Sequence, residues 1–385
     1  MNDFGWIFLP LVGIAGWYLA KYHDWQSSTK SAECGSAYYK SINYLLNEQP
    51  DKAIEVFIQM LEIDSETVET HLALGNLFRR RGEVDRAIRI HQNLIARANL
   101  SDEQRNQALL ELGQDYMKAG LFDRAESLFL ELIDINAHCE TALKFLVAIY
   151  QQEKEWGKAI STAERLQDQS KESMKVEIAH YYCELAEEEG QVDQAQSLLQ
   201  KAMDYDEKCV RASIMLGNLY MARSDYQQAI QSFSTVHQQD SDFCPQVLPR
   251  LMECHEHYNG VKEMMSYLEK ILKDHFSIPL MLMLADLIRA EEGDKKAIEF
   301  LASQLRIHPS IQGLEQLVAF SLKQSNEAEQ ETLEILHDLM QKLLYNRPNY
   351  QCQACGFEGK SLHWQCPRCK SWAQVKPIQT SSKYY

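Results

Sequence analysis

The sequence predicts an all-α fold in which a transmembrane helix is followed by a superhelical solenoid of repeated helix pairs and then by a small metal-binding ribbon. Three observations carry this prediction: an alanine that recurs about every 34 residues, an uncharged apolar stretch near the N-terminal end, and two C-x-x-C pairs near the C-terminal end. A helical repeat of about 34 residues is the tetratricopeptide period, so we expect a tetratricopeptide-repeat array.

The recurring alanine marks the second helix of each predicted pair. Its positions are Ala53, Ala87, Ala125, Ala159, Ala195, Ala229 and Ala297. The spacings are 34, 38, 34, 36, 34 and 68 residues, and 68 is twice 34. In the clearest pair, Gly217 lies on the first helix, and Ala229 and Phe233 lie on the second. Small residues of this kind are found where two helix backbones approach closely, so the repeat is a packing unit.

Composition and charge narrow the class of protein. The chain has 385 residues with only 16 Gly and 9 Pro, which leaves little room for long disordered segments. Its net charge of −16 disfavours general nucleic-acid binding. Residues 347–385 contain six basic residues and one acidic residue, a net charge of +5. The preceding residues contain 33 basic and 54 acidic residues, a net charge of −21. Six of the ten cysteines are scattered without a disulfide pattern, which favours the reducing cytosol.

Residues 1–20 are predicted to form a transmembrane anchor. Residues 4–20 carry no charge, and these 17 residues lie at the short end of what spans a bilayer, roughly 17–25 residues. Lys21 follows directly, so the positive-inside bias places the C-terminal bulk on the cytoplasmic side. A cleavable signal peptide would need a basic segment before the apolar run, and a buried capping helix is the other alternative. Residues 21–34 then form a short linker.

Residues 35–310 are predicted to hold about eight tetratricopeptide repeats. The repeat near residues 244–277 is degenerate, because Glu263 stands where the alanine belongs. We expect Met264, Met265 and Leu268 to take over the packing there.

Two further features complete the predicted array. The longer spacings of 38 and 36 residues are interpreted as loop insertions between repeats, around residues 101–105 and 173–175. Residues 311–346 supply a terminal helical pair. We expect this pair to cap the array, because the last unit must hide an open apolar face.

A stack of such pairs curves so that the first helices line a concave groove. The polar residues predicted on that inner face are Asn76, Arg79, Gln114 and Asn218. An asparagine there can hydrogen-bond a peptide backbone as both donor and acceptor. The alternative is that each is simply a solvated polar position. The array as a whole therefore predicts protein binding, with these residues as candidates for peptide contacts.

Residues 347–385 are predicted to form the metal-binding ribbon. The candidate ligands are Cys352, Cys355, Cys366 and Cys369. Two C-x-x-C turns supply four sulfurs in a tetrahedron, and Gly356 after the first pair suits the positive φ that such a turn often needs. Four protein thiolates leave no open coordination position, so the one metal ion is expected to be structural. Iron and zinc are both compatible with sulfur ligands.

No catalytic residue is predicted, and the chain is not expected to be an enzyme. The sequence holds no phosphate-binding glycine loop, no G-x-S-x-G and no H-E-x-x-H. Cys254, His255 and His257 are close in sequence, but neighbouring residues of a helix point in different directions. A second metal cluster is therefore not expected there.

Taken together, these features resemble the lipopolysaccharide assembly protein B family of Gram-negative bacteria. The resemblance rests on the short anchor, the repeat array and the terminal ribbon CQACGF…WQCPRCKSW, which closes on VKPI. Interior runs such as ALGNLFRRRGEVDRAIRIHQ (residues 73–92) and VEIAHYYCELA (residues 176–186) are similar to that family as well. The match extends over residues 4–378.

The resemblance implies an inner-membrane protein that faces the cytoplasm and regulates lipopolysaccharide synthesis. The family is understood as an adaptor that helps the membrane AAA zinc protease degrade the deacetylase committing precursors to lipid A, with a link to lipopolysaccharide transport proteins. The resemblance also implies that the ribbon is rubredoxin-like, that the four cysteines above are its ligands, and that it packs on the repeats. The charges of +5 and −21 give a physical reason for this packing.

A function of another class stays open. The basic ribbon could be a redox or nucleic-acid-binding module carried on a scaffold, although no nucleic acid is expected as a partner of the whole chain. Reversible redox activity of an iron-loaded form, or salt-sensitive nucleic-acid binding by the ribbon, would favour this alternative. The sequence does not decide the oligomeric state, for which a homodimer is one possibility, or whether the ribbon contacts lipid headgroups.

Overall fold

The computed structural model describes residues 68–170, 173–258, 260–322, 327–345 and 347–378, with the isolated residues 44, 52, 54, 56 and 58. The predicted anchor at residues 1–20, the linker at residues 21–34 and most of the first predicted repeat lie outside the described residues. In the described part, no helix is both long and apolar enough to span a membrane. The chain divides into two compact units, with the boundary between Lys154 and Glu155.

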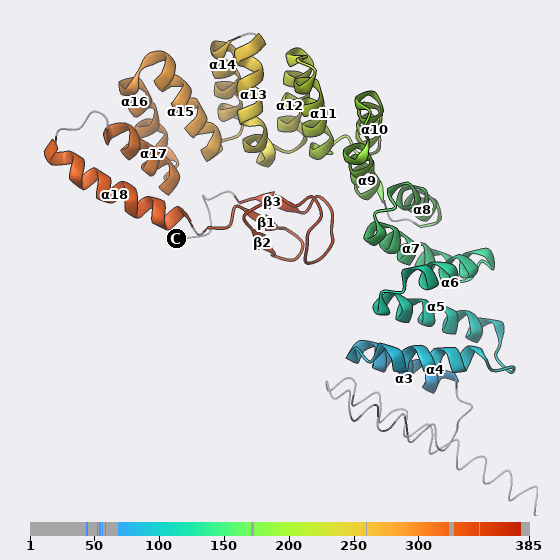
Figure 1. Ribbon diagram of the computed structural model, residues 1–385. Coiled ribbons are helices and arrows are strands. Elements are labelled where there is room, and N and C mark those ends of the chain that lie inside the picture. The colour runs from blue at the N-terminus through green and yellow to red at the C-terminus, as the bar shows by residue number, and fades with distance from the viewer. Residues whose placement is uncertain are drawn as a thin grey trace, which may run out of the picture. The chain divides into compact units, whose positions relative to one another are not determined.

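The first unit is a stack of helices joined by short turns (Figure 1). Its described helices are α3 (Val68–Arg81), α4 (Val84–Ile95), α5 (Asp102–Ala119), α6 (Phe122–Asp134) and α7 (Cys139–Glu153). Each helix packs mainly against its neighbours in sequence. Gly120 ends α5 in the left-handed conformation, with φ of 75°, which a residue without Cβ adopts freely.

The predicted loop insertion at residues 101–105 is wrong. These residues form the N-cap and first turn of α5 instead. The Ser101 hydroxyl accepts a hydrogen bond from the Gln104 backbone N–H, and the Gln104 side chain accepts one from the Ser101 backbone N–H, each at 3.2 Å. This capping box satisfies two donors that would otherwise be free at the helix end. The extra residues therefore lengthen a helix.

The second unit continues the helix pairs and ends in the ribbon (Figure 1). Its described helices are α8 (Trp156–Gln169), α9 (Lys175–Glu188), α10 (Val192–Tyr205), α11 (Val210–Ala222), α12 (Tyr226–Gln239), η1 (Ser241–Phe243), α13 (Cys244–Tyr258), α14 (Val261–Asp274), α15 (Ile278–Glu292), α16 (Asp294–Ile307), α17 (Ile311–Leu322) and α18 (Glu327–Tyr345). The strands β1 (Tyr350–Cys352), β2 (Glu358–Gly359) and β3 (Val375–Pro377) form one antiparallel sheet in the order β2-β1-β3.

The recurring small residues pack as the sequence predicts. The described repeat alanines expose at most 3% of their surface, and they are Ala87, Ala125, Ala159, Ala195, Ala229 and Ala297. A Cβ on Gly113 would lie 2.6 Å from the Phe129 ring, and one on Gly217 would lie 2.4 Å from the Phe233 ring. The first helix of each of these pairs therefore needs glycine where the aromatic ring of the second helix lies. The tetratricopeptide fold is confirmed.

Two helices depart from the regular pattern. In α14, Glu263 is exposed while Met264 and Leu268 are fully buried, and Met265 is half-buried against the same core. In α18, one side packs on the array through Met340, but several large apolar residues on another side stay exposed. The terminal pair therefore does not present the fully polar outer face that a cap usually has.

Candidate metal centre

The four candidate cysteines converge in the ribbon, with their sulfur atoms all within 4.8 Å of one another. Cys352 Sγ lies 3.7 Å from Cys369 Sγ, and Cys355 Sγ lies 3.6 Å from Cys366 Sγ. Metal–sulfur bonds of about 2.3 Å place the corners of a tetrahedral site roughly 3.8 Å apart. The distances and the donor set therefore fit one four-coordinate metal ion.

Two matching turns hold the cysteines in this arrangement. The Gly356 N–H donates to the Cys352 carbonyl, and the Lys370 N–H donates to the Cys366 carbonyl, each at 2.9 Å. Both Gly356 and Lys370 are left-handed, with φ of 71° and 61°. The sequence indicates this conformation for Gly356. It gives no such indication for Lys370, which follows the second C-x-x-C pair as Gly356 follows the first, because a residue with a Cβ rarely adopts a positive φ.

The cysteines differ in their surroundings. Cys352 and Cys366 are almost fully buried, whereas Cys369 is exposed. The Ser371 hydroxyl lies 3.5 Å from Cys369 Sγ, and hydrogen bonds from the Ser371 side chain and backbone lower the pKa of the Cys369 thiol to about 6. The lowered pKa favours the thiolate of Cys369, which is the form that binds metal. A bound ion would cross-link the two turns and leave no open position for a substrate.

The ribbon docks on the helices of the second unit through Trp372, which is only 5% exposed. Its indole stacks on His180 of α9, with ring centroids 5.0 Å apart. It also packs edge-on against Tyr181 and Trp156, at centroid distances of 5.8 and 6.4 Å. Such aromatic pairs contribute about 0.5–1.5 kcal/mol each beyond their burial. The ribbon is thus held by an aromatic cluster from α8 and α9.

A second group of contacts fixes the other side of the ribbon near η1. Trp364 stacks on Phe243 with centroids 5.6 Å apart. Lys376 Nζ lies 2.6 Å from Asp240 Oδ2 and 4.0 Å from Asp242 Oδ2. This ion pair joins the basic ribbon to the acidic repeats, as the charge asymmetry of the sequence suggests. The packing of the ribbon on the repeats is confirmed.

Acid pH should weaken the docked state through His180. Burial, and next the charge of Arg211, lowers the pKa of His180 from 6.5 to about 3. Below pH 6.5 the unfolded chain takes up a proton that the folded chain does not, so the free energy of unfolding falls by about 2 kcal/mol between pH 7 and pH 5. Urea unfolding at both pH values measures this loss. The variant His180→Phe should lack it, and an equal pH dependence in both chains would contradict the assignment.

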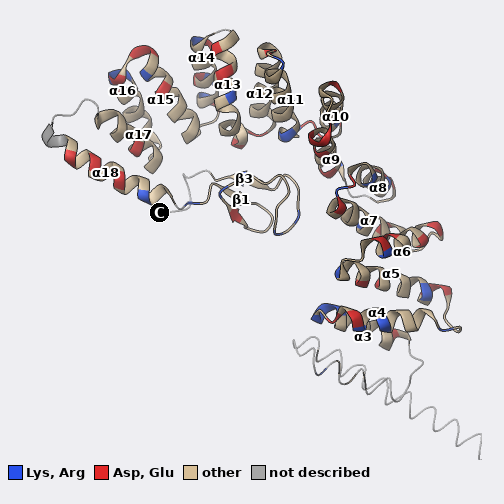
Figure 2. Ribbon diagram, viewed as in Figure 1, with Lys and Arg blue, Asp and Glu red and all other residues tan. Residues whose placement is uncertain are grey.

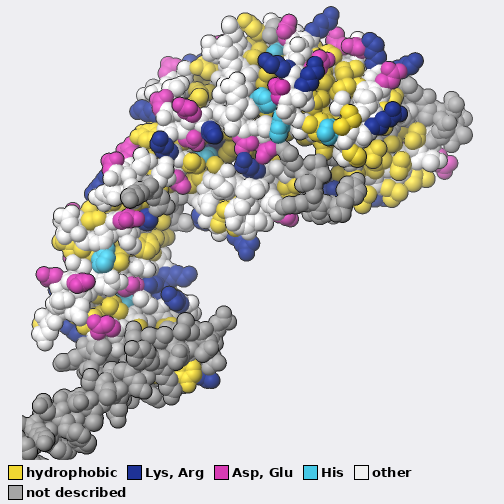
Figure 3. All heavy atoms as spheres, turned by 180° about the vertical axis from the view of Figure 1, so that it is seen from behind, with side chains coloured by type: hydrophobic (Ala, Val, Ile, Leu, Met, Phe, Trp, Pro, Cys, Tyr) yellow, Lys and Arg dark blue, Asp and Glu magenta, His cyan; other side chains and the backbone are white. Residues whose placement is uncertain are grey.

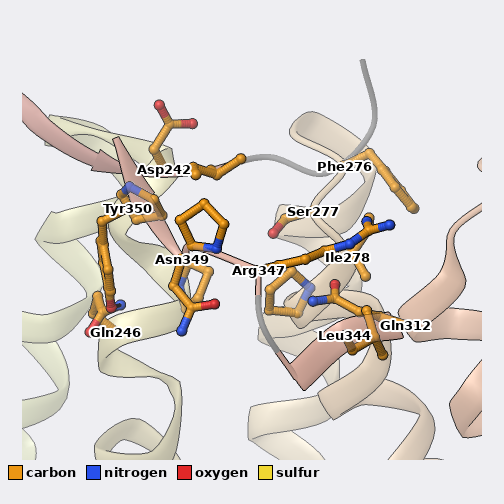
Figure 4. A pocket seen from close by; sticks show the side chains of 15 residues that line it. Asp242, Gln246, Phe276, Ser277, Ile278, Gln312, Leu344, Arg347, Asn349 and Tyr350 are labelled. Carbon is orange, nitrogen blue, oxygen red and sulfur yellow. Dashed lines mark hydrogen bonds between the residues drawn. The ribbon is translucent and has the colours of Figure 1, made fainter. Parts of the chain in front are cut away.

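A cavity of about 240 Å³ lies beside the docked ribbon. It is bounded by the start of α13, the connection from α14 to α15, and the segments that enter and leave the ribbon (Figure 4). Gln246 Nε2 donates to the Tyr350 hydroxyl at 2.5 Å on one side. Arg347 extends past Ile278 on the other side (Figure 4). Docking of the ribbon therefore creates a cavity that is lined by amide side chains, one guanidinium group and apolar side chains.

The structure brings two of the four predicted groove residues together. Arg79 of α3 donates to the Gln114 side chain of α5 at 3.2 Å. The same guanidinium pairs with Glu111 at 2.7 Å and Asp115 at 2.8 Å. Arg79 is thus held by contacts within the chain.

The other two groove candidates are separate from this network. Asn76 of α3 and Asn218 of α11 are each half-buried, the first in the first unit and the second in the second unit. Contact of any of the four residues with a bound peptide stays a prediction.

The carboxylates that hold Arg79 belong to a buried network that sequence reasoning missed. Asp115 Oδ2 lies 2.5 Å from His91 Nδ1, and both side chains are fully buried. His91 follows Gly75 by 16 residues, the same spacing that separates Gly113 from Phe129. A histidine at this aromatic position, with an acid on the following helix, could have indicated the network. It ties α3, α4 and α5 together through polar contacts.

Comparison with known proteins agrees with this architecture. A family model described as the rubredoxin metal binding domain matches residues 350–377. Models described as tetratricopeptide repeat match residues 70–105 and 186–259. The lipopolysaccharide assembly protein B of Escherichia coli (strain K12) is 40% identical over 384 residues, which cover 98% of this chain and 99% of that protein. The chain belongs to the lipopolysaccharide assembly protein B family.

A second member of the lipopolysaccharide assembly protein B family, from another organism, is also similar to this chain over nearly its full length. The protein of that name from Haemophilus influenzae (strain ATCC 51907 / DSM 11121 / KW20 / Rd) is 35% identical over 396 residues, with 98% of both chains covered. Among solved structures, YrrB, a TPR protein with an unusual peptide-binding site, is 16% identical with a TM-score of 0.35, covering 49% of this chain and 94% of its own.

Proposed function

We propose that this chain is a membrane-anchored adaptor on the cytoplasmic side of a bacterial inner membrane, and that it regulates lipopolysaccharide synthesis. In this proposal the anchor is residues 1–20, and the repeats bind partner proteins. The chain promotes degradation of the lipid A-committing deacetylase by the membrane AAA protease, and it contacts lipopolysaccharide transport proteins. The chain itself carries out no reaction.

The observation that carries the proposal is the docked ribbon on a tetratricopeptide array, in a chain whose relatives are named for lipopolysaccharide assembly. Stacked helix pairs provide extended surfaces for binding other proteins. Four converging thiolates suit a metal that stabilises the fold rather than one that reacts, since no coordination position is left open. Both features favour a scaffold.

The proposed mechanism depends on confinement. An anchor would hold the repeats in the plane where the protease and its substrate meet the bilayer. Confinement raises the effective concentration of one partner for another, and the gain in avidity can reach 10²–10⁴ without any new contact. Weak contacts along the repeats would then suffice for substrate delivery.

Removal of residues 1–20 tests this mechanism. The shortened chain should stay folded and metal-bound, but it should no longer support turnover of the deacetylase, whose half-life should lengthen severalfold in cells that lack the full-length chain. Pulse-chase measurement of the deacetylase gives the half-life. As a control, an unrelated transmembrane helix in place of residues 1–20 should restore turnover if the anchor acts by confinement alone. Full activity of the shortened chain would refute the proposed role of the anchor.

A further inference from the structure

One side of α18 exposes a row of large hydrophobic side chains. Ile335, Leu336, Leu339 and Leu343 are 57, 44, 53 and 60% exposed. Their spacing of one, three and four residues places them along one helix face. Seen from behind, hydrophobic side chains gather at this end of the second unit (Figure 3). An exposed apolar row on the last helix of an array indicates an interaction surface.

The charges of α18 are ordered along its length. In the part whose side chains are described, Glu331, Glu334 and Asp338 come first and Lys342 follows (Figure 2). Lys360 of the ribbon adds a second cation at this end, because its Nζ lies 5.4 Å from the centre of the Tyr345 ring. The helix is therefore negative as far as Asp338 and positive at its last turn.

We propose that this row is an interface between two copies of the chain, in which two α18 helices pack antiparallel with Leu339 near the two-fold axis. This arrangement places Ile335 of one copy opposite Leu343 of the other. It also places Lys342 beside Asp338 of the other copy, and two-fold symmetry makes this contact twice. In a parallel two-fold pair, the Asp338 and Lys342 side of each helix would lie on opposite sides of the seam, so these charges could not pair. The ordered charges therefore select the antiparallel pair.

The chemistry of the row also argues against a lipid surface as its occupant. Helices that lie in a membrane interface carry Lys and Arg on their polar face. In α18 three acids and one lysine accompany the described apolar row. A helix of 19 residues is about 28 Å long, so one helix pair buries less than the roughly 1,600 Å² of a standard interface. We therefore expect a reversible dimer.

Charge reversal on the full-length chain in detergent tests the pairing. Asp338→Lys alone and Lys342→Glu alone should each raise the dissociation constant of the dimer at least tenfold, because each creates two like-charge contacts. An equimolar mixture of the two variants should restore association, because every contact across that mixed pair joins opposite charges. Sedimentation velocity in density-matched detergent measures the dissociation constants. Failure of the mixture to associate would overturn the antiparallel pair, whatever the single variants do.

Photo-crosslinking identifies the occupant directly. A benzoylphenylalanine at position 339 of the full-length chain should yield, in membranes, a species of twice the chain mass, with the crosslink mapped to residues 335–343 of a second copy. The same probe at exposed position 270 on α14 is the matched control and should not do so. Crosslinking of position 339 to a different protein or to lipid, with no self-crosslink, would overturn the proposal.

An apolar-to-polar change completes the test. Leu339→Gln should abolish the dimer and leave thermal unfolding of the monomer unchanged, because the side chain is more than half exposed within the chain. A dimer that survives this change would show that the copies meet through another surface.

Discussion

Replacing Cys366 and Cys369 together with serine should release the metal ion and loosen the C-terminal repeats. The two changes remove half of the sulfur ligands, and metal binding contributes roughly 10–16 kcal/mol to the folding of small zinc domains. The ribbon has only a small apolar core, centred on Cys352, Cys366 and Val375, so it should unfold without its metal. Trp372 would then leave His180, and the aromatic contacts that join the ribbon to α9 would be lost.

Metal content and local stability report the result. Elemental analysis should fall from one metal ion per chain to none, and should also identify the ion as iron or zinc in the unchanged protein. Hydrogen exchange should accelerate in α9 and α13, and the thermal transition of the second unit should move down. Cys139→Ser, a change at a cysteine outside the cluster, is the control and should keep the metal. Unchanged thermal stability of the double variant would contradict an integral ribbon.

Trp372→Ala should separate docking of the ribbon from its folding. Truncation of a buried tryptophan costs about 3–5 kcal/mol, and here the lost contacts are those with His180, Tyr181 and Trp156. The sulfur cluster lies outside these contacts, so the metal should be retained. We therefore expect a ribbon that keeps its metal but no longer slows hydrogen exchange in the repeat helices on which it docks.

The measurement pairs metal analysis with hydrogen exchange in α9. Exchange should accelerate while the metal content stays at one ion per chain. Gln353→Ala, at an exposed position of the same ribbon, should change neither. Loss of the metal together with docking would show that the ribbon does not hold its fold apart from the repeats.

Periodic and local features are the parts of this fold that the sequence could predict. The buried glycine and aromatic pairs, such as Gly217 with Phe233, recur at a fixed spacing, so their packing follows from the repeat alone. The four cysteines converge because each C-x-x-C pair is a local turn with known geometry. Gly356 takes its positive φ for the same local reason.

Contacts between distant segments could not be predicted in this way. Nothing local in the sequence pairs Lys376 with Asp240, or places Trp372 against His180. Arg79 illustrates the same limit, because its position on the first helix suggests a groove contact, while its ion pairs depend on acids one repeat further along the chain. The loop predicted at residues 101–105 was wrong for another reason. Ser101 and Gln104 form a capping box, so a helix begins there although the repeat spacing alone suggested a loop insertion.

The ribbon is the last described segment to be synthesised, yet its supports lie far earlier in the chain. Lys376 follows Asp240 by 136 residues. At a translation rate of about 5–20 residues per second, a nascent chain spends on the order of ten seconds with this aspartate and its aromatic neighbours uncovered. Metal binding by the ribbon is therefore the last step in the folding of the second unit. In a cell short of the metal, full-length chains would keep the aromatic cluster of α8 and α9 exposed, and chaperones and proteases recognise exposed apolar surface of this kind.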